Sequence, residues 1–209
     1  MKTIVVGTDE KTDKRWTDAL HELKVYIHTI SNLSEDSWLM LQDTLTVCHF
    51  SKGDYIIALG EICQSIFFIT KGYARGFYDK EGNEINTAFY FEQEFATNLK
   101  SLTKNLKSEY AIQACEPLIA VQFDRAKLLA AYNHSPEIES FGRQLLEILA
   151  SRQEEQIALF QLLNAQERYE HLLQYQPQVV QRISLTQIAS YLGIARETLS
   201  RIRNKVKNS

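Results

Sequence analysis

Apolar and polar positions follow two different periods along the chain. Between residues 16 and 45 the apolar side chains recur at helical spacing, as in Leu20, Leu23 and Ile27. Ser34 precedes a second short apolar segment and is suited to cap it, so we expect two helices there. From about residue 45 to 123, short apolar runs alternate with Gly-, Asp- and Pro-containing turns, which predicts a β-sandwich or barrel. The expected strands are residues 47–50, 55–59, 66–69, 73–78, 85–91, 110–114 and 118–123.

Helical spacing returns after Asp124. Ser135 and Pro136 form a strong helix start, with Ser as the cap and Pro in the first turn, and the helix is expected to run to about Leu163. Its apolar stripe is wider than one face needs, so one side is expected to cover the β-domain and the other to meet a second copy. Burial of the whole helix within one chain is the alternative. The expected dimer-helix residues are Phe141, Leu145, Leu146, Leu149 and Phe160.

The C-terminal part is predicted to hold further helices. Asn164 and Glu167 have the spacing of a capping box, so a helix is expected from there to Tyr175, with residues 177–182 as a linker. Ser184 and Gln187 form a second expected capping box. The helix that they begin should end at Gly193, because a residue with positive φ is favoured there. A second helix with the apolar positions Leu199, Ile202 and Val206 follows, so residues 184–207 read as a helix-turn-helix.

The polar face of the last helix carries side chains of the kind that read DNA. Arg bonds guanine O6 and N7, and Glu accepts from cytosine N4. The predicted base-reading residues are Arg196, Glu197, Ser200 and Arg201. The predicted phosphate contacts are Thr186, Thr198, Arg203, Lys205 and Lys207. The plainer alternative is a helical hairpin with a solvated basic face.

Charge distribution supports a polyanionic partner, although total charge does not. The 209 residues carry a net charge of −3. From residue 182 to the end there are six basic side chains and one acid, so a tail of net +5 follows a body of net −8. A basic segment on an acidic body is a typical footprint of a nucleic-acid contact.

Other function classes find little support in the sequence. Cys48, Cys63 and Cys115 have no paired spacing for a metal or disulfide site, and they suit small buried apolar positions in a reducing cytosol. The five histidines show no ligand pairing, and neither a nucleophile elbow nor a phosphate loop occurs, so we expect no enzyme, no metal and no cofactor. Residues 1–15 lack the apolar core of a signal peptide, and no run is long enough to span a bilayer, so the expected location is cytoplasmic.

A β-domain with Lys-Gly turns, a long helix and a helix-turn-helix together resemble the Crp/Fnr superfamily of bacterial transcription regulators, from about residue 20 to 207. The most specific match is Arg196, Glu197 and Arg201, which fit an Arg-Glu-x-x-x-Arg segment that reads bases in this family. Tyr169, Pro177 and residues 189–194 resemble a subgroup common in the Bacteroidetes. The resemblance implies an α+β fold: an N-terminal cyclic-nucleotide-binding-like β-roll (jelly roll) with flanking helices, a long dimerisation helix and a C-terminal helix-turn-helix domain. The implied divisions are residues 1–134, 135–163 and 164–209.

The resemblance also implies an effector pocket, and here the sequence departs from the family. Cyclic-nucleotide members carry a Gly-Glu pair and then an Arg-Ser pair that hold the ribose and the cyclic phosphate. In register, these positions fall on Thr97 and Asn98, and on Ser108 and Glu109; the adenine-contacting pair of the long helix becomes Gln153 and Glu154. A serine lacks the fork of donors that a phosphate requires, and Glu109 would repel it. We therefore predict that cyclic AMP does not bind tightly.

Three hypotheses about function follow. The first is a homodimeric regulator that binds a pseudo-palindromic DNA site through two recognition helices about 34 Å apart, with RNA polymerase and an unidentified small-molecule effector as further candidate partners. The second is a ligand-sensing module that acts through protein–protein contacts. The third, an enzyme, has no motif to support it. Lys100, Lys104 and Lys107 lie in the cassette, so an anionic effector stays open, beside the simpler view of a solvated helix face.

Overall fold

The protein is described by a computed structural model, which covers residues 14–207, with the side chain of Lys207 left out. Of the N-terminal segment 1–15, residues 1–13 lie outside the described residues, and Lys14 and Arg15 begin the first helix. The helices are α1 (Lys14–Ile30), α2 (Glu35–Gln42), α3 (Leu99–Lys104), α4 (Arg125–Tyr132), α5 (Pro136–Leu162), α6 (Ala165–Tyr175), α7 (Pro177–Arg182), α8 (Leu185–Leu192) and α9 (Arg196–Lys207). The strands are β1 (Leu45–Phe50), β2 (Tyr55–Ile57), β3 (Ser65–Lys71), β4 (Ala74–Lys80), β5 (Asn83–Tyr90), β6 (Phe95–Ala96), β7 (Ala111–Ala114) and β8 (Leu118–Asp124).

The described chain divides into two compact units. The first, the sensor unit, contains the residues up to 76 and 90–149, and the second, the C-terminal unit, contains 77–89 and 150–209. The division falls inside α5, and it assigns most of the β4–β5 hairpin to the C-terminal unit. The predicted three-part division at residues 134 and 163 stays a prediction.

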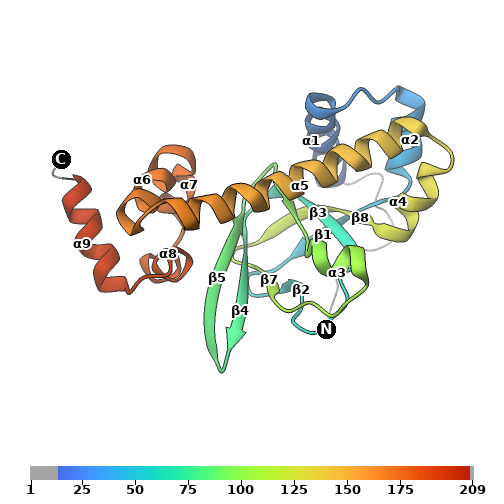
Figure 1. The fold of residues 1–209 in the computed structure, drawn as a ribbon. Helices are drawn as coiled ribbons and strands as arrows, with labels where there is room; N and C mark the ends of the chain where they lie inside the picture. The colour runs from blue at the N-terminus through green and yellow to red at the C-terminus, as the bar shows by residue number, and fades with distance from the viewer. Residues whose placement is uncertain (1–13, 208–209) are drawn as a thin grey trace. The chain divides into compact units, whose positions relative to one another are not determined.

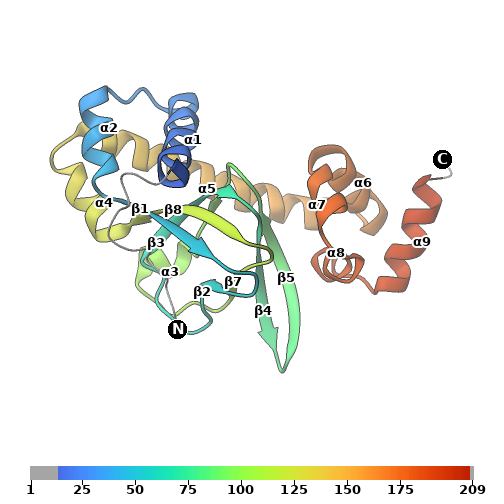
Figure 2. The same ribbon diagram turned by 180° about the vertical axis from the view of Figure 1, so that it is seen from behind.

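The strands form the expected β-roll of two four-stranded sheets, ordered β1-β8-β3-β6 and β2-β7-β4-β5. In the first sheet β1 pairs antiparallel with β8, from Leu45 opposite Phe123 to Phe50 opposite Leu118. Helix α1 packs on this sheet, against β1, β3 and β8 (Figure 2). A tight turn joins β4 and β5, where Glu81 and Gly82 both have positive φ, as a two-residue type I′ hairpin turn requires.

An aromatic chain forms the core of the sensor unit. Tyr26 of α1 meets Phe68 of β3 with ring centroids 5.0 Å apart, and Phe95 of β6 lies 5.0 Å from Phe68. The chain continues to Phe123 of β8 and Phe141 of α5, each step 6.1 Å between centroids. Because these rings come from five elements, their burial holds the helices against the sheet.

The start of α5 fits the same core closely. Ser135 accepts a hydrogen bond from the Ile138 N–H at 3.3 Å, so it caps the helix as predicted. Gly142 lies against Tyr132 of α4, and a Cβ at residue 142 would lie 1.8 Å from the Tyr132 hydroxyl oxygen. Glycine therefore permits the approach of α4 to α5. Burial raises the pKa of the Tyr132 hydroxyl.

The structure refines the predicted secondary structure at two places. The linker predicted at residues 177–182 is itself a short helix, α7, because Pro177 stands at its first turn and Val179 is fully buried. Strand β2 is expected to reach residue 59 but ends at Ile57. Leu59 is 50% exposed, and the chain turns directly after it at Gly60, which has positive φ. The pattern also gave no sign of β6, whose two residues are too few to show a period.

Candidate functional site

The α8–α9 pair has the geometry that the sequence predicted. Ser184 accepts from the Gln187 N–H at 3.3 Å and caps α8, while its hydroxyl donates to Gln187 Oε1 at 3.0 Å. In a full capping box the Gln187 side chain would accept from the Ser184 backbone N–H. Here it accepts from the Ser184 hydroxyl instead, so only one of the two bonds of the predicted capping box is present. Gly193 ends the helix with φ 70 and ψ 31, and the Ile194 N–H donates to the Ala189 carbonyl at 3.0 Å. The left-handed residue therefore turns the chain into α9.

Apolar side chains fix the two helices against α6 and α7. Ile188, Ala189 and Leu192 are buried, as is Leu199 of α9, whereas Ile202 and Val206 are half-buried. Tyr169 and Leu172 of α6 complete this small core, and the predicted Asn164–Glu167 capping box that begins α6 is present.

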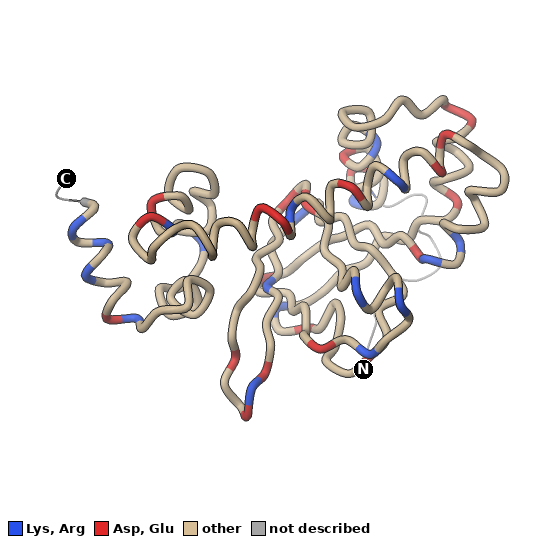
Figure 3. The backbone as a smooth tube through the Cα atoms, in the orientation of Figure 1, with Lys and Arg blue, Asp and Glu red and all other residues tan. Residues whose placement is uncertain are grey.

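The four predicted base-reading side chains share one exposed face of α9. Arg196, Ser200 and Arg201 follow helical spacing, and Glu197 adjoins them; all four are exposed. Figure 3 shows basic residues along α9 with one acid near its start. Within the described part of the chain, no hydrogen bond or ion pair holds these four side chains, so the face is free for a ligand that offers acceptors and donors.

The predicted phosphate contacts are more dispersed. Thr186 and Thr198 are exposed, near the N-terminal ends of α8 and α9, and Arg203 is half-exposed. Lys205 donates from Nζ to Gln166 Oε1 of α6 at 3.0 Å, so it is directed to the α6 side. The side chain of Lys207 lies outside the described ones.

The predicted effector residues are divided between the two units. Thr97, Asn98, Ser108 and Glu109 come together in the sensor unit, whereas Gln153 and Glu154 are exposed residues of the C-terminal unit. The first three are buried and hydrogen-bonded to one another or to backbone. Asn98 donates to the Ser108 hydroxyl at 2.6 Å and caps α3 by accepting from the Ser101 N–H at 3.0 Å.

Ser108 has no free hydrogen-bond donor left to bind an anion. Its hydroxyl accepts from Asn98 and donates to the Tyr110 carbonyl, and its backbone N–H and C=O bond Glu61 and Gly60. Glu109 is exposed and pairs with Lys100 of α3 at 2.7 Å. The cassette is therefore a self-contained polar network with a surface ion pair beside it.

The dimer-helix prediction requires a correction. Phe141 and Leu145 are fully buried and Leu149 is 8% exposed, so these three pack within the chain and cannot face a second copy. Leu146 is 41% exposed, and Ile157, which the prediction did not include, is 56% exposed. Phe160 contacts Tyr191 at 5.7 Å and lies under the Arg168 guanidinium at 4.8 Å. The exposed large apolar side chains of α5 are therefore Leu146, in the part of the helix assigned to the sensor unit, and Ile157 and Leu162, in the part assigned to the C-terminal unit.

Sequence reasoning missed a set of contacts within the C-terminal unit. Ser190 of α8 accepts from the Asn86 N–H at 3.0 Å and donates to the Glu84 carbonyl at 3.2 Å, so α8 is bonded to the edge of β5. Arg168 donates from Nη1 to the Leu192 carbonyl at 3.1 Å. These partners lie up to 106 residues apart, and no local pattern marks them.

The cysteines and the other described side chains that could bind a metal stand apart from one another. Cys48 and Cys63 are buried, and burial raises the pKa of the Cys115 thiol to about 11, which makes it a poor nucleophile. Between residues 14 and 206, His, Cys, Asp and Glu side chains form no group able to hold a metal ion. None of the described helices is both long and apolar enough to cross a bilayer.

Residues 47–135 match the family described as cyclic nucleotide-binding domain. None of the curated protein sequences matches the chain. Among solved structures, FixK2 from Bradyrhizobium japonicum is similar with a TM-score of 0.62 and 18% identity, over 78% of this chain and 85% of that one.

Two further regulators have the same architecture. The global regulator CLP of Xanthomonas campestris has a TM-score of 0.65 at 13% identity, over 84% of this chain and 92% of its own. The catabolite activator protein of Thermus thermophilus has a TM-score of 0.52 at 19% identity, over 85% of each chain. At such identities the likeness establishes a common fold.

Proposed function

Because residues 47–135 match the cyclic nucleotide-binding domain family and the chain has the fold of Crp/Fnr-type regulators, we propose that it is a dimeric, sequence-specific DNA-binding transcription regulator. The observation that carries this proposal is the exposed face of α9. Four side chains able to read base edges share it, and the turn at Gly193 sets it against α8. In a major groove, Arg196 and Arg201 would donate to guanine and Glu197 would accept from cytosine.

A dimer follows from the geometry that such a site needs. Recognition helices of paired subunits enter successive major grooves about 34 Å apart, which makes the DNA site pseudo-palindromic. The exposed apolar side chain of Leu146, in the sensor unit's part of α5, offers a surface for the second copy. A parallel pairing of the long helices would bury it.

The sensor is proposed not to bind cyclic AMP tightly. A cyclic phosphate needs charged or forked donors, and the buried hydroxyl at Ser108 is already bonded on both sides. DNA binding would then occur without this nucleotide. A different effector would act by binding one arrangement of the chain better than another.

The test is fluorescence anisotropy of the purified chain against palindromic DNA selected from a random pool, with and without cyclic AMP. We expect tight, salt-dependent binding that cyclic AMP leaves unchanged. Replacing Arg201 with Ala should cost about 1–3 kcal/mol on the selected site and relax the preference at one base pair, whereas Arg203→Ala should weaken all sequences alike.

Three outcomes would contradict parts of this proposal. Equal losses on selected and random DNA in Arg201→Ala would remove its base-reading role. Binding that appears only with cyclic AMP would overturn the interpretation of Ser108. Absent or salt-insensitive DNA binding would favour the alternative of a sensor that acts through protein contacts.

A further inference from the structure

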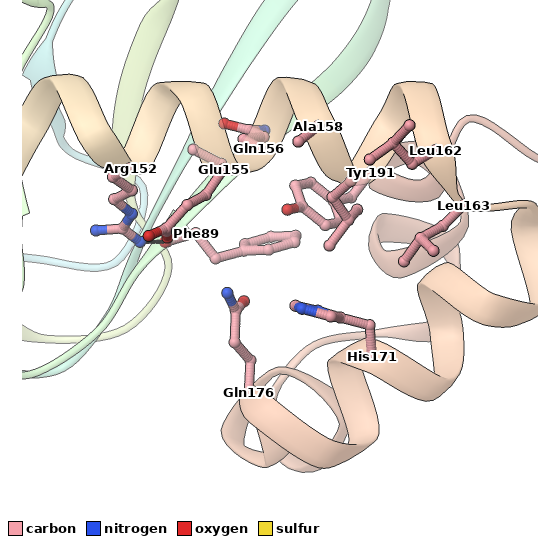
Figure 4. Close-up of a pocket in the computed structure, with 12 residues that line it drawn as sticks. Phe89, Arg152, Glu155, Gln156, Ala158, Leu162, Leu163, His171, Gln176 and Tyr191 are labelled. Atoms are coloured by element: carbon pink, nitrogen blue, oxygen red, sulfur yellow. Dashed lines mark hydrogen bonds between the residues drawn. The ribbon is translucent and has the colours of Figure 1, made fainter.

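The C-terminal unit contains a cavity of about 400 Å³ that the proposed function does not use. Its walls come from β5, α5, α6 and α8, all within this unit. Figure 4 shows side chains around it, which include Phe89, Leu163, His171, Gln176 and Tyr191, and Leu159 also lines it. Cavities of this size are typical of small-molecule sites, which combine apolar walls with a few polar groups.

Fixed aromatic side chains form one wall of the cavity. The rings of Phe89 and Tyr191 lie 5.3 Å apart, and Tyr191 meets the edge of Phe160 at 5.7 Å. Both Phe89 and Tyr191 are buried, so they are held by packing. Leu159 and Leu163 add aliphatic surface, so the body of a fitting ligand is apolar.

Polar groups line another side of the cavity. Figure 4 shows the imidazole of His171 and the amide of Gln176 directed toward the space below Phe89. The Nδ1 atom of His171 is buried and has no hydrogen-bond partner among the described residues. Because Nδ1 is closed to solvent, a ligand oxygen would instead bond the other imidazole nitrogen, Nε2, which no hydrogen bond to the described residues occupies.

Charge at the cavity favours an acidic ligand end. Arg152 lines it and donates from Nη2 to the Phe89 carbonyl at 2.9 Å, which keeps its guanidinium at the β5 side. The acid among the lining residues, Glu155, is an exposed residue. A carboxylate thus meets donors from an imidazole and an amide in the field of a guanidinium.

We propose that this cavity binds a small monocarboxylate with an apolar body, such as a medium-chain fatty acid, with its carboxylate on His171 and Gln176. Tyr191 belongs to α8 and Leu159 to α5, so the ligand contacts both the α8–α9 pair and the C-terminal part of the long helix. Occupation therefore stabilises this arrangement of the C-terminal unit. The cavity is defined without DNA, so the proposal stands whether or not α9 reads bases.

Calorimetric titration of the full chain with octanoate tests the proposal, with octylamine as the matched probe of opposite charge. We expect one octanoate to bind per chain, and octylamine to bind at least about tenfold more weakly because the polar side offers donors. Ala88→Phe, at a half-exposed position of the lining, should fill the cavity and abolish binding. Arg143→Gln, on the same helix α5 but outside the lining, should leave binding unchanged.

A measurement on the unmodified chain keeps the test independent of folding in the variants. The chain has five histidines, and among them His171 alone lines this cavity. In a carbon–proton NMR spectrum of the imidazole groups, octanoate should move the His171 signal and leave those of His21, His28, His49 and His134 in place. Equal binding of octanoate and octylamine, retention of octanoate binding in Ala88→Phe, or an unmoved His171 signal would each overturn the proposal.

Discussion

The segment from Thr97 to Tyr110, which contains α3 and is called the loop below, and the helix α9 both carry polar side chains, but they differ in what those side chains bond. In the loop, Asn98 and Ser108 are nearly fully buried and bond each other, α3 and the backbone. On α9, Arg196 and Arg201 are exposed, and no bond to the described part of the chain holds them.

This difference separates polar groups that are bonded within the fold from polar groups that stay open to a partner. A buried polar group must be hydrogen-bonded, so the donors and acceptors of the loop are consumed by the fold. An exposed arginine adds little to stability and keeps its five donors for a partner. The family resemblance implies an effector at the loop and DNA at α9; the exposed side chains of α9 keep their donors and acceptors, whereas those of Asn98 and Ser108 are bonded within the fold.

The largest effect should follow from restoring an arginine to the loop. Ser108→Arg places a charge at a site that is 2% exposed and removes the acceptor of Asn98. We expect it to lower the free energy of unfolding by about 3–5 kcal/mol, since a buried unpaired charge is that costly. Urea unfolding followed by tryptophan fluorescence measures this, because Trp16 and Trp38 both lie in the sensor unit.

Glu109→Arg serves as the control for Ser108→Arg. It adds the same side chain one residue on, at an exposed position, so its effect should stay below about 1 kcal/mol. If Ser108→Arg retained full stability and gained affinity for cyclic AMP, the loop would have room for a phosphate and the comparison would fail.

Two serines of the α8–α9 pair test the same distinction within one unit. Ser184 caps α8, and Ser200 lies on the exposed face of α9. Ser184→Ala should destabilise the C-terminal unit by about 1 kcal/mol, whereas Ser200→Ala should stay within about 0.5 kcal/mol. Hydrogen exchange of the α8 amides reports the stability of this unit.

DNA affinity of the Ser200→Ala variant completes that test. It should fall on the selected site although the stability is unchanged. Loss of stability in Ser200→Ala, or none in Ser184→Ala, would show that exposure and bonding do not separate the two roles.

A smaller effect on the free energy of unfolding is expected at the exposed ion pair within the loop. Lys100 and Glu109 are 57% and 59% exposed in their side chains, so solvent screens their attraction. Glu109→Ala should change the free energy of unfolding by less than about 1 kcal/mol, and 1 M salt should remove the difference. A larger, salt-resistant loss would place Glu109 in the buried network with Ser108.

Local signals in the sequence predicted much of the fold and of the α9 face. The helix starts at Ser34, Ser135, Asn164 and Ser184 depend on side chains within three residues, so they can be read directly. The base-reading face follows from helical spacing alone. The β-roll as a fold followed from turn residues and from the family resemblance.

Long-range packing set the limits of that prediction. The periodicity of α5 marks Phe141 and Leu146 alike as apolar, but only the fold shows that Phe141 packs on Phe123 while Leu146 is exposed. The bond of Ser190 to β5 spans about a hundred residues, and the cavity at His171 is formed by four elements. No spacing rule can signal contacts that depend on how separate elements meet.

The last test concerns Glu137, whose carboxylate is hydrogen-bonded within the chain, like the side chains of Asn98 and Ser108, but lies at the surface. Its Oε2 accepts from the Ser34 N–H at 2.8 Å and from the Ser34 hydroxyl at 2.7 Å, which joins the start of α5 to the cap of α2. These hydrogen bonds lower the pKa of Glu137 from its usual 4.5, because they favour the ionised form.

The stabilisation from Glu137 is therefore fully present above pH 4.5, and it is lost as pH falls below 4.5 through the lower pKa of the folded state. Urea midpoints measured between pH 7 and pH 3 should fall more steeply in the wild-type chain than in Glu137→Gln, with the two curves converging at the acidic end. The effect should be small, since solvent competes for an exposed carboxylate. Parallel curves would mean that bonding without burial does not commit a polar group to the fold, and the distinction between the loop and α9 would then rest on burial alone.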